Sequence, residues 1–344
     1  MWPIYGHSRA VALLQRSISE GRIAHAYLFT GPPKTGKATL AKVFAQALNC
    51  DGEDPPCGRC RLCHSFDSET HPDLRVVRPG RIEGNSVEEG NDEASKTGRS
   101  IGIAQIWDLQ RDAALLPYEA RWKVYIIDGA ESLTIPAANC LLKTLEEPAS
   151  SVVLILTAAD GKILPATVVS RCQEIALGLM SVEAVQKVLQ EQRNVDTERA
   201  RLLSHLSAGR IGWAIDALDK DILADRESVL DEIAGLVVAS RTERFSYAER
   251  LAAQFGRQVE AARYAMDLWL TWWRDLLLVG AKCSDLVMNI DRIGELTEQA
   301  RQYSVDQVLD FILALEEASD QLGKNVNPRL ALEALMLRMP CPAR

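Results

Sequence analysis

A loop rich in glycine, proline and lysine limits what this chain can fold into more than any other feature. It reads GPPKTGK at residues 31–37, follows the short apolar run Ala26–Phe29, and precedes Ala38–Leu48, which has helical spacing. In the order strand, loop, helix, the pattern G-x-x-x-x-G-K is typical of a phosphate-binding loop, where backbone N–H groups and a helix N-terminus attract phosphates. The candidate nucleotide-binding residues of this loop are Gly31, Gly36 and Lys37.

The sequence lacks two groups that ATP hydrolysis needs. A Ser or Thr hydroxyl that binds Mg²⁺ should follow Lys37, and the chain has Ala38 there. A buried-strand pattern ends in Asp128, an acid suited to hold Mg²⁺, but the glutamate that should come next to polarise water is replaced by Gly129. Glu131 would need a different backbone path to take over that role. We therefore expect no hydrolysis by this chain, whereas passive nucleotide binding stays open.

The first half of the chain alternates apolar runs with helical stretches, which predicts a parallel α/β sheet. The runs Lys123–Asp128 and Val152–Leu156 are continuous, as expected of buried strands, and Ala137–Leu145 between them has helical spacing. The segment Gly80–Arg99 is polar and almost without apolar residues, so it is predicted to be a flexible surface insertion, with or without a function of its own.

Strand patterns stop near residue 181, and the rest of the chain is predicted to be helical. The predicted helices are Ser181–Arg193, Thr197–Ser207, Ile211–Ala217, Val259–Val279 and Val305–Leu322. We therefore predict three domains: an α/β domain at 1–179, a small helical domain at 180–240 and a helical bundle at 241–344. The aromatic segment Trp269–Trp273 is predicted to lie in the core of that bundle.

Four of the eight cysteines fall within the short segment 50–63. Cys50, Cys57, Cys60 and Cys63 have the spacing C-x₆-C-x₂-C-x₂-C, which lets two tight turns and a helix end bring four thiolates into a tetrahedron. Four sulfur ligands with no open position indicate structural zinc; a redox C-x-x-C pair or a coincidence is the alternative. Two histidines nearby are spare candidates, His64 and His71, of which His71 is expected in a turn. The remaining cysteines are predicted to pack rather than to bind metal: Cys140, Cys172, Cys283 and Cys341.

Composition and charge argue against several classes of protein. The 344 residues are 47% hydrophobic and 25% charged, as in ordinary globular proteins, and no uninterrupted apolar run reaches about 18 residues. The first residues lack the basic start and apolar core of a secretory signal, so a cytoplasmic location with reduced thiols is expected. The net charge of −8 disfavours a protein that grips DNA by itself and favours protein partners.

Five stretches of the chain together resemble one family, the clamp-loader subunits of bacterial DNA polymerase III, and among them the δ′ type. They read GRIAHAYLF at 21–29, the four-cysteine segment with HPD at 71–73, AANCLLKTLEEP at 137–148, SRC at 170–172 and NVNPRLALE at 325–333. These stretches span nearly the whole chain, and the LLKTLEEP run is highly specific.

The resemblance implies an AAA+ fold: a RecA-like parallel α/β domain with a zinc module at 50–63, a small helical lid, and an all-α C-terminal collar that joins subunits into a pentameric ring. It also implies the partners, which are the tau/gamma motor subunits and the delta subunit, with the sliding clamp and primer–template DNA reached through the complex and no membrane. Ser170-Arg171-Cys172 matches the family's trans-acting arginine finger, which makes Arg171 the candidate catalytic residue for a neighbour's ATP. An exposed or salt-bridged arginine is the ordinary alternative.

Three hypotheses of function follow from these features. The first is a stator that helps load the clamp in DNA replication, holds structural Zn²⁺ and has no ATPase activity of its own; the second is a self-sufficient AAA+ motor of the tau/gamma type. The motor keeps the full phosphate and Mg²⁺ motifs and a lid arginine, so Ala38, Gly129 and Gly212 in this chain favour the stator. The third, a zinc-dependent nucleic-acid binder, is disfavoured because the chain is acidic and its cysteine segment lacks interleaved basic and aromatic residues.

Overall fold

The computed structural model describes residues 2–80, 100–219, 222–257, 259–323 and 326–340. The chain packs as two compact units, one formed by Met1–Ala184 with Gly209–Gly212, the other by Val185–Ala208 with Trp213–Arg344. Apart from Gly80, the predicted insertion at 80–99 lies outside the described residues. The predicted division into three domains at residues 179 and 240 stays a prediction.

The first unit is built on a five-stranded sheet in the order β2-β3-β4-β1-β5, with every neighbouring pair parallel. The strands are β1 (Ala26–Thr30), β2 (Leu74–Val77), β3 (Lys123–Ile127), β4 (Val152–Ala158) and β5 (Gln173–Ala176). In the register, Tyr27 of β1 lies opposite Ile155 of β4 and Gln173 of β5. β1, β3 and β4 are buried at every residue, which explains their continuous apolar runs, because helices cover both faces of a parallel sheet.

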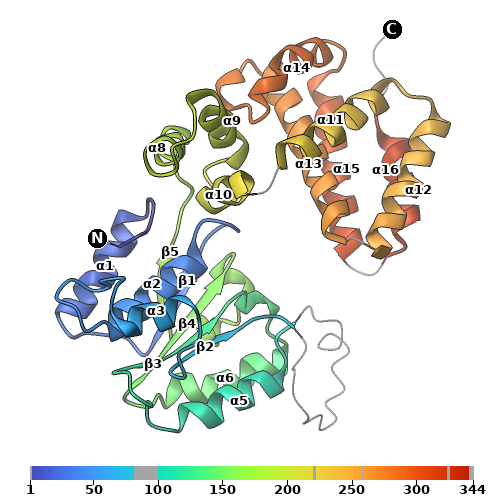
Figure 1. Cartoon of the computed structure of the whole chain (residues 1–344). Coiled ribbons are helices and arrows are strands. Elements are labelled where there is room, and N and C mark those ends of the chain that lie inside the picture. Colours follow the sequence, from blue (N-terminus) through green and yellow to red (C-terminus); the bar gives the residue numbers. More distant parts are fainter. Residues whose placement is uncertain (1, 81–99, 220–221, 258, 324–325, 341–344) are drawn as a thin grey trace. The chain divides into compact units, whose positions relative to one another are not determined.

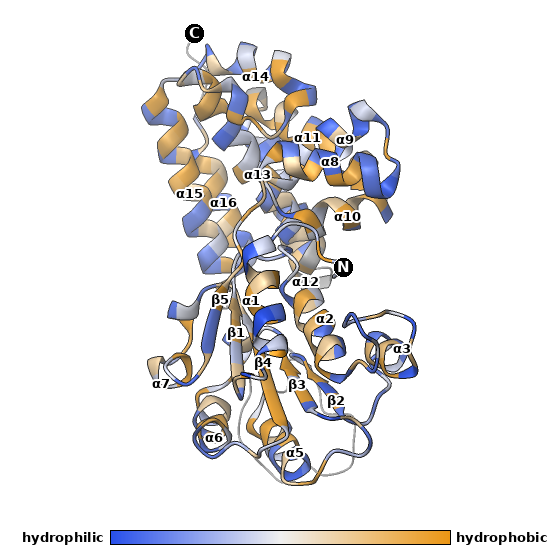
Figure 2. Cartoon of the chain, turned by 90° about the vertical axis from the view of Figure 1, so that its left-hand side faces the viewer, coloured by the Kyte–Doolittle hydropathy of each residue, from blue (hydrophilic) through white to orange (hydrophobic). Residues whose placement is uncertain are grey.

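Helices cover the two faces of this sheet (Figure 1). One face carries α1 (Ser8–Ser19), α2 (Lys37–Asn49) and α3 (Arg61–Asp67), and the other carries α5 (Ile103–Ala113), α6 (Ile135–Glu146) and α7 (Ala166–Val169). Because side chains alternate along a strand, Tyr27 and Phe29 of β1 face the first layer, whereas Leu28 faces the second. Tyr27 packs edge-on against Phe44 of α2, with ring centroids 4.9 Å apart. Figure 2 shows hydrophobic residues along the central strands.

Beyond β5 the described chain is helical, as predicted. The helices are α8 (Val182–Arg193), α9 (Thr197–Ser207), α10 (Ile211–Asp219), α11 (Ile222–Val238), α12 (Arg241–Arg257), α13 (Val259–Gly280), α14 (Ile293–Ala300), α15 (Val305–Gly323) and α16 (Pro328–Arg338). Among the described residues, no helix is long and apolar enough to cross a membrane.

The aromatic segment of α13 is core, which confirms the prediction. Trp269, Trp272 and Trp273 are each at most 1% exposed. The indole N–H of Trp269 donates to the hydroxyl of Tyr247 at 2.9 Å, and Trp273 packs on Phe311 with ring centroids 4.5 Å apart. Each buried indole removes a large apolar area from water, so this cluster is a major source of stability for the helical unit.

The prediction that the scattered cysteines pack in the core is confirmed for two of them and wrong for one. Cys140 and Cys172 are half-buried against the apolar core on the α5–α6 face of the sheet, as expected of packing residues. The prediction is wrong for Cys283, which is exposed. α13 ends at Gly280, and Lys282 then takes a left-handed conformation with φ 60°, so the chain turns away before Cys283 can pack. Cys341 lies outside the described residues.

Candidate nucleotide site and metal-binding cluster

The ends of three adjacent strands bring the predicted nucleotide residues to one edge of the sheet. Loop 31–37 follows β1, Asp128 follows β3, and Thr157 lies near the end of β4 between them. The hydroxyl of Thr157 donates to Asp128 Oδ1 at 2.8 Å and accepts from the N–H of Gly129 at 3.0 Å. This is the edge at which parallel sheets commonly bind ligands. Thr157 therefore orients the predicted Mg²⁺ acid, and its only signal in the sequence is a polar residue in an apolar run.

Gly129 stands where a hydrolytic glutamate would be needed, and its backbone favours glycine. Its φ is +80°, in the left-handed region. A Cβ there would find its nearest atoms 3.9 Å away, on Pro79 and Ser132, so space is not the obstacle. The obstacle is the backbone conformation, because a residue with a side chain in the left-handed region costs about 1–2 kcal/mol. Restoring the glutamate would thus require the backbone after β3 to change.

Lys37 begins α2, and its ammonium group folds back onto the loop. Nζ donates to the carbonyl oxygens of Gly31 at 2.6 Å and Pro32 at 2.8 Å. Burial lowers the pKa of Lys37, and the nearby charges of Glu131 and Asp128 oppose that shift. Both carboxylates therefore act electrostatically on Lys37. A phosphate would reach Lys37 only by displacing its two carbonyl partners.

The loop offers fewer backbone donors than its motif suggests. Pro32 and Pro33 have no N–H, and the N–H of Gly31 is already bonded to carbonyl oxygens at the end of β4 and just after it, at 3.2 Å each. The first N–H groups of α2 remain unpaired within the helix, as at any helix N-terminus. Ala38 lies in this first turn and offers a methyl group where Mg²⁺ would need an oxygen. The edge can attract a phosphate, but it lacks the hydroxyl ligand for a metal.

The four predicted cysteine ligands converge. Their Sγ atoms all lie within 4.8 Å of one another, and those of Cys57 and Cys63 are 4.0 Å apart. Tetrahedral zinc with Zn–S bonds of about 2.3 Å places sulfur atoms about 3.8 Å apart, so little contraction is needed. Cys50 caps the C-terminus of α2 and Cys60 caps the N-terminus of α3, so helix ends position them. Neither His64 nor His71 belongs to the cluster among the described residues.

Backbone N–H groups point at these sulfur atoms. Cys50 Sγ accepts from the N–H groups of Gly52 and Cys57, each at 3.2 Å, and Cys60 Sγ accepts from that of Cys63 at 3.3 Å. Gly52 leaves room for this arrangement, since a Cβ there would stand 2.8 Å from Cys57 Cβ. Gly52 was not predicted, because it carries no signal in the sequence apart from its place between the first two cysteines.

The cluster's protonation fits a metal site. The N–H groups of Arg59 and Cys60 lower the pKa of the Cys57 thiol to about 6. Burial raises the pKa of Cys50 and that of Cys63, so a cation must supply the charge that stabilises their thiolates. Four sulfur donors of this kind suit zinc, which would be held with no open position and hence in a structural role.

Arg171 lies in the turn between α7 and the edge strand β5. Its Nη2 donates to Glu146 Oε1 at 2.7 Å, and its Nη1 donates to the carbonyl of Thr167 at 2.9 Å and to Ser170 Oγ at 3.3 Å. The side chain is 35% exposed. Arg171 is therefore salt-bridged and partly exposed, as in the alternative interpretation of this residue as an ordinary surface arginine. These three bonds leave the Nε–H and one N–H of Nη2 for a further acceptor.

Comparison with known proteins shows which family the chain belongs to. The family model described as DNA polymerase III, delta subunit, matches residues 6–181. The DNA polymerase III subunit delta' of Bacillus subtilis is 30% identical over 332 residues, which is 96% of this chain and 95% of that protein. The chain belongs to the DNA polymerase III delta' family.

Two further matches were found, one in sequence and one in structure. The DNA polymerase III subunit tau of Bacillus subtilis is 29% identical over 362 residues, 98% of this chain and 60% of tau. The crystal structure of a gamma subunit-related protein from Thermotoga maritima aligns over 96% of this chain and 99% of that one, with 16% identity and a TM-score of 0.42.

A buried histidine holds the turn that precedes β2 in this delta' family member. His71 lies in a turn, as predicted, because its Nδ1 accepts the N–H of Asp73 at 3.0 Å. It is also buried, and its Nε2 bonds to Glu119 at 3.1 Å. Asp73 in turn accepts three backbone N–H groups from residues 118–120 at 2.7–3.0 Å, which lowers its pKa against the effect of burial. The histidine therefore serves the fold and leaves metal binding to the cysteines.

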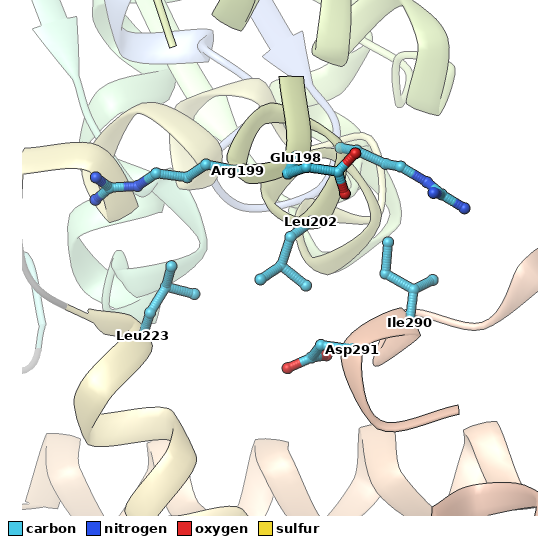
Figure 3. Close-up of a pocket in the computed structure, with 7 residues that line it drawn as sticks. Glu198, Arg199, Leu202, Leu223, Ile290 and Asp291 are labelled. Carbon is cyan, nitrogen blue, oxygen red and sulfur yellow. The ribbon is translucent and has the colours of Figure 1, made fainter. Parts of the chain in front are cut away.

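A cavity of about 400 Å³ lies in the second unit of the delta' family chain (Figure 3). Leu202 of α9, Leu223 of α11 and Ile290 line it, with Asp291 beside them. Arg199 extends away from these apolar side chains in the close-up. None of the residues predicted for the nucleotide, metal or arginine sites lines this cavity, and its polar groups do not converge on one point, so we assign it no function.

Proposed function

We propose that this chain is the δ′-type subunit of the DNA polymerase III clamp loader, a stator that helps load the sliding clamp onto primed DNA. The observation that carries the proposal is the state of the sheet edge: the strand, loop and helix of a phosphate site are in place, while Ala38 and Gly129 stand where two oxygen-bearing side chains would be needed. Hydrolysis needs both groups placed together. We therefore expect the chain to contribute to a motor through a residue outside this edge.

Arg171 is the group we propose for that contribution. A guanidinium is permanently charged and matches phosphate oxygens with a planar fork. The Nε–H and the remaining Nη2 N–H of Arg171 could donate to the γ-phosphate of ATP bound by a neighbouring subunit. Charge that builds on the transferred phosphoryl group would then be stabilised, an effect worth about 10³–10⁵ in rate in well-studied GTPases.

The partners follow from the same proposal. The neighbours would be tau/gamma motor subunits and the delta subunit, with the clamp and primer–template DNA reached through the assembled ring. The C-terminal helices from Arg241 onward would form the collar that joins it, and zinc in the cysteine cluster would stabilise the first unit. A cytoplasmic location remains a prediction from the sequence.

A self-sufficient motor of the tau/gamma type is the second candidate. It is favoured by the electrostatic coupling of Lys37 with Asp128 and Glu131 at one edge. Under that hypothesis Glu131 would replace the missing glutamate. Turnover by the isolated chain that disappears in Lys37→Ala would support it.

The deciding experiment measures ATP turnover by the chain alone and after mixing with tau/gamma and delta subunits. The wild-type chain alone should show no turnover above background. Arg171→Ala should leave folding and assembly intact while lowering turnover by the complex, and Arg171→Lys should restore little because a point charge cannot reproduce the fork. Arg22→Ala, at an exposed arginine paired with Glu20, is the control and should change nothing. A fully assembled Arg171→Ala complex with normal turnover would refute the proposed role.

A further inference from the structure

The turn between α9 and α10 is bonded to the phosphate loop. This segment, Gly209–Gly212 (the glycine turn), includes the first two residues of α10 and belongs to the α/β unit, whereas the rest of α9 and α10 belongs to the second unit. The N–H of Gly212 donates to the carbonyl oxygen of Lys34 at 2.9 Å. At the other end of the turn, the carbonyl of Gly209 accepts the N–H of Met180 at 3.0 Å. Backbone bonds thus fix the glycine turn at both ends.

Both ends of the turn exclude a side chain. A Cβ on Gly212 would stand 2.7 Å from the carbonyl oxygen of Lys34, and one on Gly209 would stand 2.3 Å from that of Met180. Gly209 also has a left-handed φ of +80°. These obstacles are backbone atoms, which cannot swing aside as the end of a flexible side chain can. The close approach to the loop therefore depends on glycine.

Other segments hold the phosphate loop from further directions. The loop begins at Gly31, where a Cβ would stand 2.1 Å from the carbonyl oxygen of Leu177. His7 Nε2 bonds to the carbonyl of Thr35 at 2.9 Å, while the Thr35 hydroxyl donates to the carbonyl of Pro32 at 2.9 Å. Lys34 itself has φ +63°, a conformation that a lysine keeps when its surroundings impose it. The chain itself thus supplies bonds to residues 31, 32, 34 and 35 of the loop.

We propose that the glycine turn is a clasp that holds the phosphate loop in one conformation whether or not nucleotide is bound. This inference rests on the proposed function, because it takes the loop to be structural. A ligand can shift a conformational equilibrium only by its differential affinity for the two states. Here the bond to Lys34 comes from the chain itself, and Lys37 already bonds two loop carbonyls. ATP would therefore find the loop already ordered, and its binding would not switch the turn.

Hydrogen exchange in the full-length chain, read by mass spectrometry with and without Mg²⁺-ATP, tests the clasp. The Gly212 amide and the peptide that covers loop 31–37 should be protected without nucleotide, and Mg²⁺-ATP should leave the protection of Gly212 unchanged. Gly212→Ala adds the excluded Cβ, and Gly212→Pro also removes the donor at a position where a helix start tolerates proline. Each should raise exchange in loop 31–37 by about fivefold, as expected for the loss of one backbone hydrogen bond.

Gly178→Ala is the matched control. This glycine lies next to Leu177, has no atom within 4 Å of a built Cβ and no left-handed φ, so its variant should exchange as wild type does. Circular dichroism and zinc content establish that each variant is folded. If a Gly212 variant does not fold, the exchange of the Gly212 amide in the wild-type chain, with and without Mg²⁺-ATP, still tests the clasp.

Two outcomes would overturn the clasp. One is an unprotected Gly212 amide that becomes protected on addition of Mg²⁺-ATP, and the other is a folded Gly212→Ala chain with wild-type exchange in the loop. Because no neighbouring subunit takes part, these outcomes are independent of the Arg171→Ala result, which bears on the proposed function alone.

Discussion

Helix α2 has a candidate site at each of its ends. At its N-terminus, loop 31–37 joins a strand to a helix as a phosphate-binding loop does, but it lacks the predicted oxygen groups for Mg²⁺ and water. At its C-terminus, Cys50 joins three other cysteines whose sulfur atoms converge within 4.8 Å. The same helix therefore carries one site whose chemistry is incomplete and one whose predicted ligands are all present.

The difference teaches how motifs should be interpreted. A metal site of this kind consists of side-chain atoms, and the loss of one sulfur removes a quarter of the coordination. A phosphate cradle is made largely of backbone, so its shape survives when the catalytic side chains are lost. The cysteine motif therefore indicates a function, whereas the loop motif on its own indicates only a fold.

The largest expected effect is at the cysteine end. Cys60→Ser should abolish zinc binding and lower the free energy of unfolding by about 4 kcal/mol or more, the range typical of a lost structural metal. Metal analysis and thermal unfolding of the purified chain measure both. Cys283→Ser, at an exposed cysteine outside the cluster, should have no effect on either. A folded wild-type chain without zinc would contradict the prediction that the cysteine end of α2 holds a structural metal.

At the phosphate end we expect the surviving polar bonds to stabilise the fold. Thr157→Val leaves the carboxylate of Asp128 and the N–H of Gly129 without the hydroxyl that joins them, so the free energy of unfolding should fall by about 2 kcal/mol. Thr39→Val, at an exposed threonine in the first turn of α2, should change it little. Urea unfolding compares the two variants, and equal stabilities would show that Thr157 is not part of the structural framework.

The sequence predicted the elements better than their contacts. Continuous apolar runs predicted the strands that begin at Ala26, Lys123 and Val152. The cysteine spacing predicted a cluster that the structure shows. β2 and β5 were not predicted individually, because they are four residues long and mixed in burial. Short edge strands carry little periodic signal.

The missed contacts join segments that are distant in the sequence. Thr157 meets Asp128 because β4 lies beside β3, and Gly212 meets Lys34 because the glycine turn packs on the α/β unit. Strand order and packing follow from the whole fold, so no local pattern around these residues could reveal them. Arg171 shows the same limit: its motif suggested a role, but its bond to Glu146 appeared only in three dimensions.

Restoring one missing group would sharpen the comparison. Ala38→Thr should return a hydroxyl to the first turn of α2 and raise Mg²⁺-dependent affinity for nucleotide by about tenfold, as for a hydrogen-bonding group placed on a charge. ATP turnover should stay at background, because Gly129 still offers no carboxylate. Binding of a fluorescent ATP analogue with Mg²⁺ or with EDTA measures the change. Ala38→Val has the same shape without the oxygen and should bind as wild type; equal gains in both variants would contradict the argument.

The smallest effect concerns an ion pair between the segment after α3 and the edge of the sheet near Asp128. Glu69 follows α3 of the cysteine segment, and Arg78 follows β2 and lies 3.7 Å from Asp128. Their side chains form two hydrogen bonds of 2.9 Å each. Arg78, and to a lesser degree Lys42, lower the pKa of Glu69 from 4.5 to about 2 against the effect of burial. A carboxyl group whose pKa is lower in the folded state stabilises the fold above its unfolded pKa.

This stabilisation should therefore be complete above pH 4.5 and should disappear as the pH falls from 4.5 to 2. Because the pair is partly exposed to solvent, we expect it to be worth about 1 kcal/mol. Urea unfolding between pH 3 and pH 7 should show a smaller loss of stability on acidification in Glu69→Gln than in the wild-type chain. Glu53→Gln, at an exposed position of the same segment, keeps the wild-type profile if the argument is right. Identical pH profiles for wild type and Glu69→Gln would mean that the two sites share a helix but no electrostatic link.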